Sequence, residues 1–101
     1  MSRKPPASVR AEASRGLSER AKAVPSKRGG TAVGIARARD LSNGRAVSDS
    51  VIKRMLSFFA RHSVDKRTKG SKAEQAWLLW GGDSGRAWAQ REARKMVKRQ
   101  R

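Results

Sequence analysis

The chain has 101 residues, 37% of them hydrophobic, and carries 25 Lys and Arg against 8 Asp and Glu, a formal net charge of +17. This length limits it to one small domain with little spare stability. It contains no cysteine, which excludes disulfides and thiolate metal sites, and its apolar runs are too short to span a bilayer.

The first thirty residues predict two segments outside a central core. Residues 1–6 are basic and contain two prolines, which predicts a disordered basic arm. Val9, Ala13 and Leu17 then recur at helical spacing, so residues 7–30 are expected to form an amphipathic helix, ending near Pro25, and a basic, Gly-containing flexible linker.

A second and a third helix are predicted between residues 31 and 62. Thr31 is the expected N-cap of the second helix, which Asn43-Gly44 should end. Ser48 is the expected N-cap of the third helix, with Asp49 in its first turn, where a negative charge suits the helix dipole. One face of the third helix should carry Val51, Met55, Phe58, Phe59 and His62.

The last third of the chain predicts two more helices after a polar loop over residues 63–70. Ser71 and Glu74 match a capping box and open a short apolar helix that Gly81-Gly82 should end. Asp83 or Ser84 is expected to cap a fifth helix, which leads to a basic tail over residues 98–101. No alternating strand pattern is present. We therefore predict an all-α bundle of four to five short helices, with its core domain over residues 31–97 and basic flexible termini.

Three strings together carry a likeness to a known module: RARDLSNG at residues 37–44, FFARH at 58–62 and AWLLWGGD at 76–83. The set resembles a short module that recurs in tailed-bacteriophage and prophage proteins, both as small free-standing proteins and within larger head-associated ones. The resemblance spans residues 7–95. Similar sequences carry a longer Gly-rich loop before the Ala-Trp pair than this chain has. The likeness implies a phage setting, with phage head proteins as candidate partners, but no mechanism.

The residues that invite a catalytic or metal-binding interpretation have simpler explanations. His62 is the single histidine and has no Cys or second His with which to share a metal, so a packed histidine at a helix end, pairing with Asp65, is favoured. A magnesium site would need Asp40, Asp49, Asp65, Glu74 and Asp83, but several of these acids stand at predicted helix starts. We expect a non-enzymatic protein with no catalytic residue, no metal and no cofactor.

Three further patterns leave alternatives open. The turn at residues 81–85 lacks the Lys-Ser/Thr ending of a P-loop and is expected to join two helices, although a single phosphate could bind at the following helix start beside Arg86. The tryptophans Trp77, Trp80 and Trp88 are expected to form a core, which we favour over stacking on unpaired bases. As another alternative, they could form a hairpin that docks on another protein. Residues 31–62 could form a helix-turn-helix, but their connection is longer than the usual tight turn.

Charge is the strongest functional signal, because Lys and Arg side chains that reach phosphates release counterions and bind without reading sequence. We predict a nucleic-acid-binding protein of phage origin that contacts duplex DNA through phosphates, with a virion or head-assembly module and a ribosome-associated RNA-binding protein as alternatives. Its expected location is the bacterial host cytoplasm, with packaging in or attachment to the virion as the other option. The predicted nucleic-acid-binding residues are Arg3, Lys4, Arg10, Lys27, Arg28, Arg37, Arg45, Lys53, Arg54, Lys66, Arg67, Lys69, Arg86, Lys95, Lys98 and Arg99.

Overall fold

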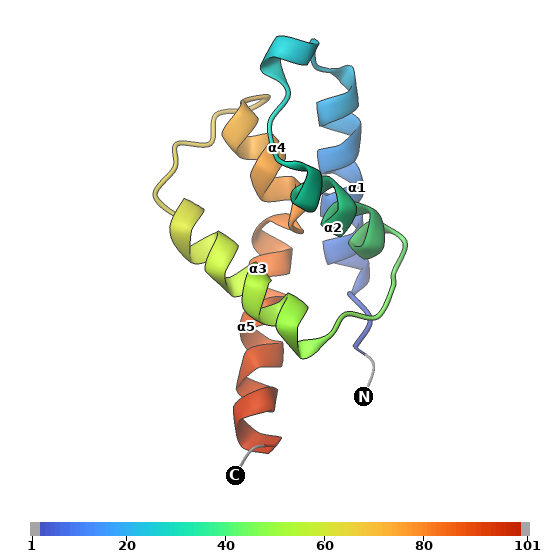
Figure 1. Ribbon diagram of the computed structural model, residues 1–101, viewed down its shortest axis with the longest axis vertical. Helices are drawn as coiled ribbons and strands as arrows, with labels where there is room; N and C mark the ends of the chain where they lie inside the picture. The colour runs from blue at the N-terminus through green and yellow to red at the C-terminus, as the bar shows by residue number, and fades with distance from the viewer. Residues whose placement is uncertain (1–2, 100–101) are drawn as a thin grey trace.

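The computed structural model describes residues 3–99, with only the backbone of Arg99. The described chain is all-α, as predicted, and its only β-type pairing is an isolated bridge between Arg3 and Val47. In chain order the elements are α1 (Ala7–Lys22), a short 3-10 helix η1 (Pro25–Lys27), α2 (Ala32–Ser42), α3 (Asp49–His62), α4 (Lys72–Leu79) and α5 (Gly82–Arg99) (Figure 1).

Hydroxyl caps start three of these helices where the sequence predicts them. Thr31 Oγ1 accepts a hydrogen bond from Gly34 N at 3.2 Å, Ser48 Oγ from Val51 N at 3.3 Å, and Ser71 Oγ from Glu74 N at 3.1 Å. These oxygens satisfy backbone donors that a helix start leaves without an intrahelical partner. The three predicted N-caps are confirmed.

The start of α5 differs from the prediction, because its cap comes from another helix. Glu12 of α1 accepts a hydrogen bond from Ser84 N at 3.0 Å. Asp83, a predicted cap, instead accepts a hydrogen bond from Trp77 Nε1 at 2.8 Å. The Glu12 carboxylate therefore occupies the anion position at this helix start, where the sequence left room for a phosphate.

The core lies between two groups of helices. One group is α1 packed on α2 and α4, and the other is α3 packed on α5. The five aromatic rings of Phe58, Phe59, Trp77, Trp80 and Trp88 are each at most 8% exposed. Phe59 meets Trp77 edge to face, with 4.8 Å between ring centroids, an arrangement that suits the ring quadrupoles. The favoured prediction that the tryptophans form a core is confirmed.

The first helix belongs to this core instead of standing outside it. Val9 and Ala13 are fully buried. Gly16 lies at the crossing with α4, where a Cβ atom would stand 2.7 Å from the backbone N of Leu79. The domain therefore begins well before residue 31, because α1 supplies one wall of the core.

The predicted arm and linker are also held by the fold. Arg3 O accepts a hydrogen bond from Val47 N at 3.0 Å, and Pro5 is fully buried. In the linker, the buried side chain of Gln75 accepts a hydrogen bond from Gly29 N at 2.7 Å and donates one to Lys27 O at 3.2 Å. The predictions of a disordered arm and a flexible linker are thus wrong for residues 3–6 and 27–29, while residues 1–2 lie outside the described part of the chain.

The structure also differs from the predicted basic tail and from the helix-turn-helix alternative. Residues 98 and 99 continue α5, whereas residues 100–101 lie outside the described part. The helices α2 and α3 pack mainly on other partners, α2 on α1 and α4 and α3 on α5. In a helix-turn-helix the first helix supports the second, so this arrangement does not match that alternative.

We predict that Gly16→Ala lowers the free energy of unfolding by about 1–3 kcal/mol, the usual cost of overpacking a filled interior. Alanine is a better helix former than glycine by about 1 kcal/mol, so helix propensity alone would stabilise the variant. A loss of stability would therefore be due to the close contact between α1 and α4. Chemical denaturation followed by circular dichroism measures the change. The control is Ser18→Ala, at an exposed position of the same helix, which should be neutral or slightly stabilising; an equal gain in both variants would contradict the close contact.

Candidate nucleic-acid interface

The acidic side chains are almost all engaged in contacts within the fold. Every Asp and Glu except Glu19 makes a hydrogen bond or an ion pair with another described residue. Glu74 accepts a hydrogen bond from Gly70 N at 2.9 Å, and Asp65 pairs with His62 Nδ1 at 2.7 Å. The carboxylates therefore connect parts of the fold, and among the exposed cations they pair with Arg15, Arg45 and Lys95.

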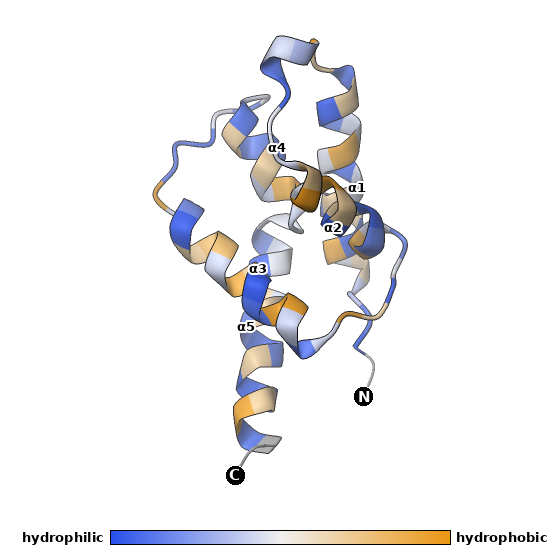
Figure 2. Cartoon of the chain, in the orientation of Figure 1, coloured by the Kyte–Doolittle hydropathy of each residue, from blue (hydrophilic) through white to orange (hydrophobic). Residues whose placement is uncertain are grey.

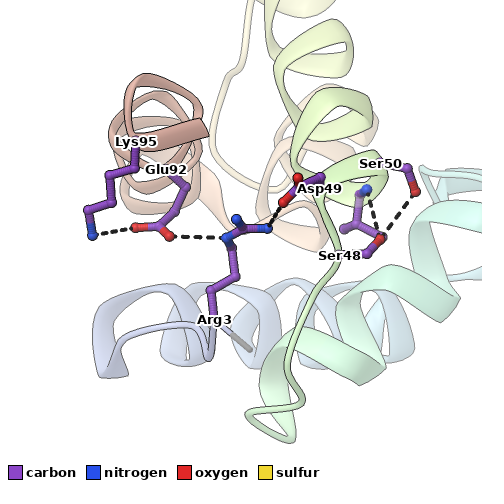
Figure 3. Close-up of polar contacts among 7 residues, drawn as sticks. Arg3, Ser48, Asp49, Ser50, Glu92 and Lys95 are labelled. Carbon is purple, nitrogen blue, oxygen red and sulfur yellow. Dashed lines mark hydrogen bonds and ion pairs between the residues drawn. The ribbon is translucent and has the colours of Figure 1, made fainter. Parts of the chain in front are cut away.

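Arg3 is the centre of the most buried ionic group. Its guanidinium lies between Asp49 at the start of α3, 2.6 Å away, and Glu92 of α5, 3.1 Å away (Figure 3). Lys95 Nζ binds the other oxygen of Glu92 at 2.9 Å. The side chains of Arg3 and Glu92 are each only 10% exposed. Arg3 thus ties the N-terminal segment to α3 and α5 and is not free on an arm.

Six other predicted binding residues also make contacts within the fold. Arg67 lies 3.7 Å from the centre of the Trp77 ring and donates a hydrogen bond to His62 O, and Arg37 lies over Trp80 at 5.7 Å. Both positions favour a cation above an aromatic face. The remaining contacts are Arg10 to Pro5 O, Arg28 to Ala23 O, Arg45 to Asp40 and Lys95 to Glu92.

The other predicted cations point outward from several elements. Exposed side chains without a polar partner among the described residues belong to Lys4, Lys27, Lys53, Arg54, Lys66, Lys69, Arg86 and Lys98. They do not form one site. Lys27 and Lys69 line a polar hollow with Lys72, whereas Lys53 and Arg54 line a separate groove on α3. The side chain of Arg99 lies outside the described part.

The densest array of cations runs along the second half of α5. Arg91, Arg94, Lys95 and Lys98 are all exposed and follow each other at spacings of three or four residues, so they share one side of the helix. We call them the α5 cationic face. Glu92, the only acid in this stretch, is 8% exposed and binds Arg3 through one carboxylate oxygen and Lys95 through the other. Arg91, Arg94 and Lys98 are thus the members of the face without a carboxylate partner among the described residues. Figure 1 shows this end of α5 projecting beyond α3.

Sequence reasoning named two members of this face and missed Arg91 and Arg94. Arg91 and Arg94 lie seven and four residues before Lys98, a spacing that places all three side chains on one side of a helix and that could have been recognised in the sequence. The contact between Glu92 and Arg3 could not be predicted from the sequence, because the two residues are 89 positions apart.

The residues that suggested catalysis have structural partners. His62 pairs with Asp65 and lies against Phe58, with 4.5 Å between ring centroids, which agrees with the favoured interpretation of a packed histidine. Within residues 3–99 no three His, Cys, Asp or Glu side chains gather as metal ligands would. The alternative of a hairpin at Trp77–Trp88 that docks on another protein stays a prediction, although the three indoles are buried and offer little surface to a partner.

Comparison with known proteins adds no family. No protein-family model, no curated protein and no solved structure matches the chain. No described helix combines the length and apolar character needed to cross a membrane.

The ionic group around Arg3 predicts a pH dependence of stability. Burial raises the pKa of Glu92, but the hydrogen bonds and charges of Lys95 and Arg3 outweigh that effect, so its pKa lies below the ordinary value of 4.5. A carboxylate with a lowered pKa in the folded state stabilises the protein above its unfolded-state pKa. That contribution is lost as the pH falls through the lowered pKa of the folded state.

We therefore expect Glu92→Gln to lower the free energy of unfolding by about 1–3 kcal/mol near neutral pH. The difference from the unmodified protein should shrink as the pH drops below 4.5, the ordinary value for Glu. Urea denaturation at a series of pH values measures it. Glu19→Gln makes the same chemical change at a side chain without a polar partner in the described chain and should have little effect. A difference that grows toward acid pH would count against the buried ionic group.

Proposed function

We propose that this protein is a non-enzymatic, basic nucleic-acid-binding protein that holds duplex DNA through phosphate contacts made by the α5 cationic face. The observation that carries the proposal is that face: four exposed cations lie on one side of a projecting helix, and within the described chain only Lys95 is paired with a carboxylate, that of the buried Glu92. The sequence resemblance adds a phage setting, in which the DNA is that of the phage or its host.

The dimensions of the face suit a phosphate backbone. Arg91 and Lys98 are seven residues apart, which corresponds to about 10 Å along a helix. About three nucleotides of one DNA strand cover the same distance. A helix of about 10–12 Å diameter also fits along the major groove, which is about 12 Å wide. Several side chains of α5 can therefore reach successive phosphates together.

The side chains of this face favour contacts with phosphates over contacts with base edges. From Arg86 to Lys98 the only uncharged polar side chain is that of Gln90. Half to two-thirds of protein–DNA hydrogen bonds go to phosphate and sugar, and Arg and Lys make many of them. Arg and Lys can also read guanine, but the amide side chains that read adenine are represented in this stretch by Gln90 alone. We therefore propose binding with little sequence preference. The negative end of the helix dipole lies at this end of α5, and the cations there offset it.

Salt titration tests the proposal with a charge-matched pair of variants. Fluorescence anisotropy should show the affinity for a labelled duplex falling steeply between about 50 and 200 mM salt. The variant Arg91→Gln/Arg94→Gln/Lys98→Gln should bind more weakly. The slope of log affinity against log salt should drop by about 0.9 for each phosphate that the variant can no longer neutralise.

The control variant is Arg15→Gln/Arg39→Gln/Arg45→Gln, which removes the same charge at exposed positions of other elements. Arg15 and Arg45 already face Glu74 and Asp40 at 3.8 and 4.0 Å, so this variant should keep most of the affinity and the slope. Equal weakening in both variants would show that net charge and not the α5 cationic face binds DNA. Tighter binding to structured RNA at matched salt would favour the RNA-binding alternative.

A further inference from the structure

A second surface differs in character from the α5 cationic face. A groove of about 930 Å³ lies between α3, the start of α2 and the second half of α4. Apolar side chains from three helices line it, among them Val33, Ala60 and Ala76. Val33 is 53% exposed, and removing its apolar side chain from water would be favourable. The groove thus leaves apolar surface uncovered in the isolated chain.

Cations line the same groove along α3. Lys53, Arg54 and Arg61 all contribute to its wall, and none of the three is paired with a carboxylate within the described chain. No Asp or Glu of residues 3–99 lines the groove. Lys53 and Arg61 are eight residues apart, about 12 Å along the helix, which matches about two turns of a helix laid alongside. An occupant that complements this surface carries apolar side chains next to carboxylates.

The aromatic rings of the groove argue against an unpaired base as the occupant. Phe58 and Trp80 line it but stack on each other, with 4.9 Å between centroids and 13° between planes. They are 6% and 8% exposed, and Arg37 also lies over the Trp80 ring. A nucleobase binds such sites by stacking on a free ring face, and these faces are already used within the fold.

Charge also argues against a second copy of this chain. The chain carries a net charge of +17, so two copies repel each other, and the groove would place unpaired cations in the interface. A sugar–phosphate backbone could pair with the cations, but it lacks the hydrocarbon side chains that would cover Val33 and its neighbours. An acidic amphipathic helix meets both requirements.

We propose that the groove between α2, α3 and α4 docks an acidic amphipathic helix of a partner protein. Its apolar side would cover Val33, Ala60 and Ala76, and its carboxylates would pair with Lys53, Arg54 and Arg61. This surface uses elements other than the second half of α5, so the proposal stands or falls independently of DNA binding by that helix.

The test uses a synthetic peptide of about 16 residues, long enough to form a helix, with Leu on one side and Glu elsewhere. Titration into ¹⁵N-labelled protein, followed by amide chemical shifts, should perturb residues of the groove and leave the second half of α5 unchanged. A second peptide with Ser in place of Leu keeps the charge and should bind at least tenfold more weakly, because its side chains bury no apolar surface in the groove.

Two charge-matched protein variants make the test specific. Val33→Asp lies in the groove, in the first turn of α2, where an acid suits the helix dipole, so the variant should fold. Val64→Asp makes the same change at a loop position that is 87% exposed and outside the groove. We expect about tenfold weaker peptide binding for the first variant and little change for the second.

Several outcomes would overturn the proposal. These are equal binding of the Leu and Ser peptides, equal effects of the two variants, shift changes outside the groove, or no shift changes at about millimolar peptide, the weakest affinity of interest. A DNA duplex that perturbs the groove residues and loses affinity with Val33→Asp would assign the groove to nucleic acid instead. Loss of DNA binding by the α5 variant alone would leave the proposal for the groove standing.

Discussion

The organisation of this protein depends on how its few carboxylates are used. With 8 acidic residues against 25 basic ones, the carboxylates can pair with only a minority of the cations. Glu12 of α1 binds the start of α5, and Glu92 of α5 holds Arg3, so these acids join segments that are distant in sequence. The connections stabilise the fold, and the excess of positive charge is left on the outer faces.

The excess of positive charge makes the stability of the folded state depend on the anions that surround the protein. Like charges on a compact molecule repel each other, and a chain of this size has a small core to offset the repulsion. Some cations are used by the fold itself, as when Arg67 covers the Trp77 ring. Others, on α5 and in the hydrophilic connection between α3 and α4, face outward (Figure 2). A polyanion that binds only the folded state stabilises it by mass action.

The two candidate surfaces differ in the chemistry that they offer. The α5 cationic face is polar and lies along the end of a projecting helix in a molecule 48 Å long. The groove along α3 combines cations with an apolar floor. A phosphate backbone satisfies the first surface, whereas the second needs apolar groups as well as negative charge.

The helices could be predicted from the sequence, because capping hydroxyls at Thr31, Ser48 and Ser71 and the spacing of apolar residues act over a few positions. The sequence also indicated that the tryptophans lie inside and that positive charge dominates. Which cations stay without a partner could not be predicted, because that depends on how the helices pack. Arg3 and Arg67 look as available in the sequence as Lys98 does, yet their partners lie on elements that meet only after folding. The tertiary structure also decided that α1 joins the core and that Gly29 is fixed by Gln75, since contacts across 46 residues leave no local pattern to read.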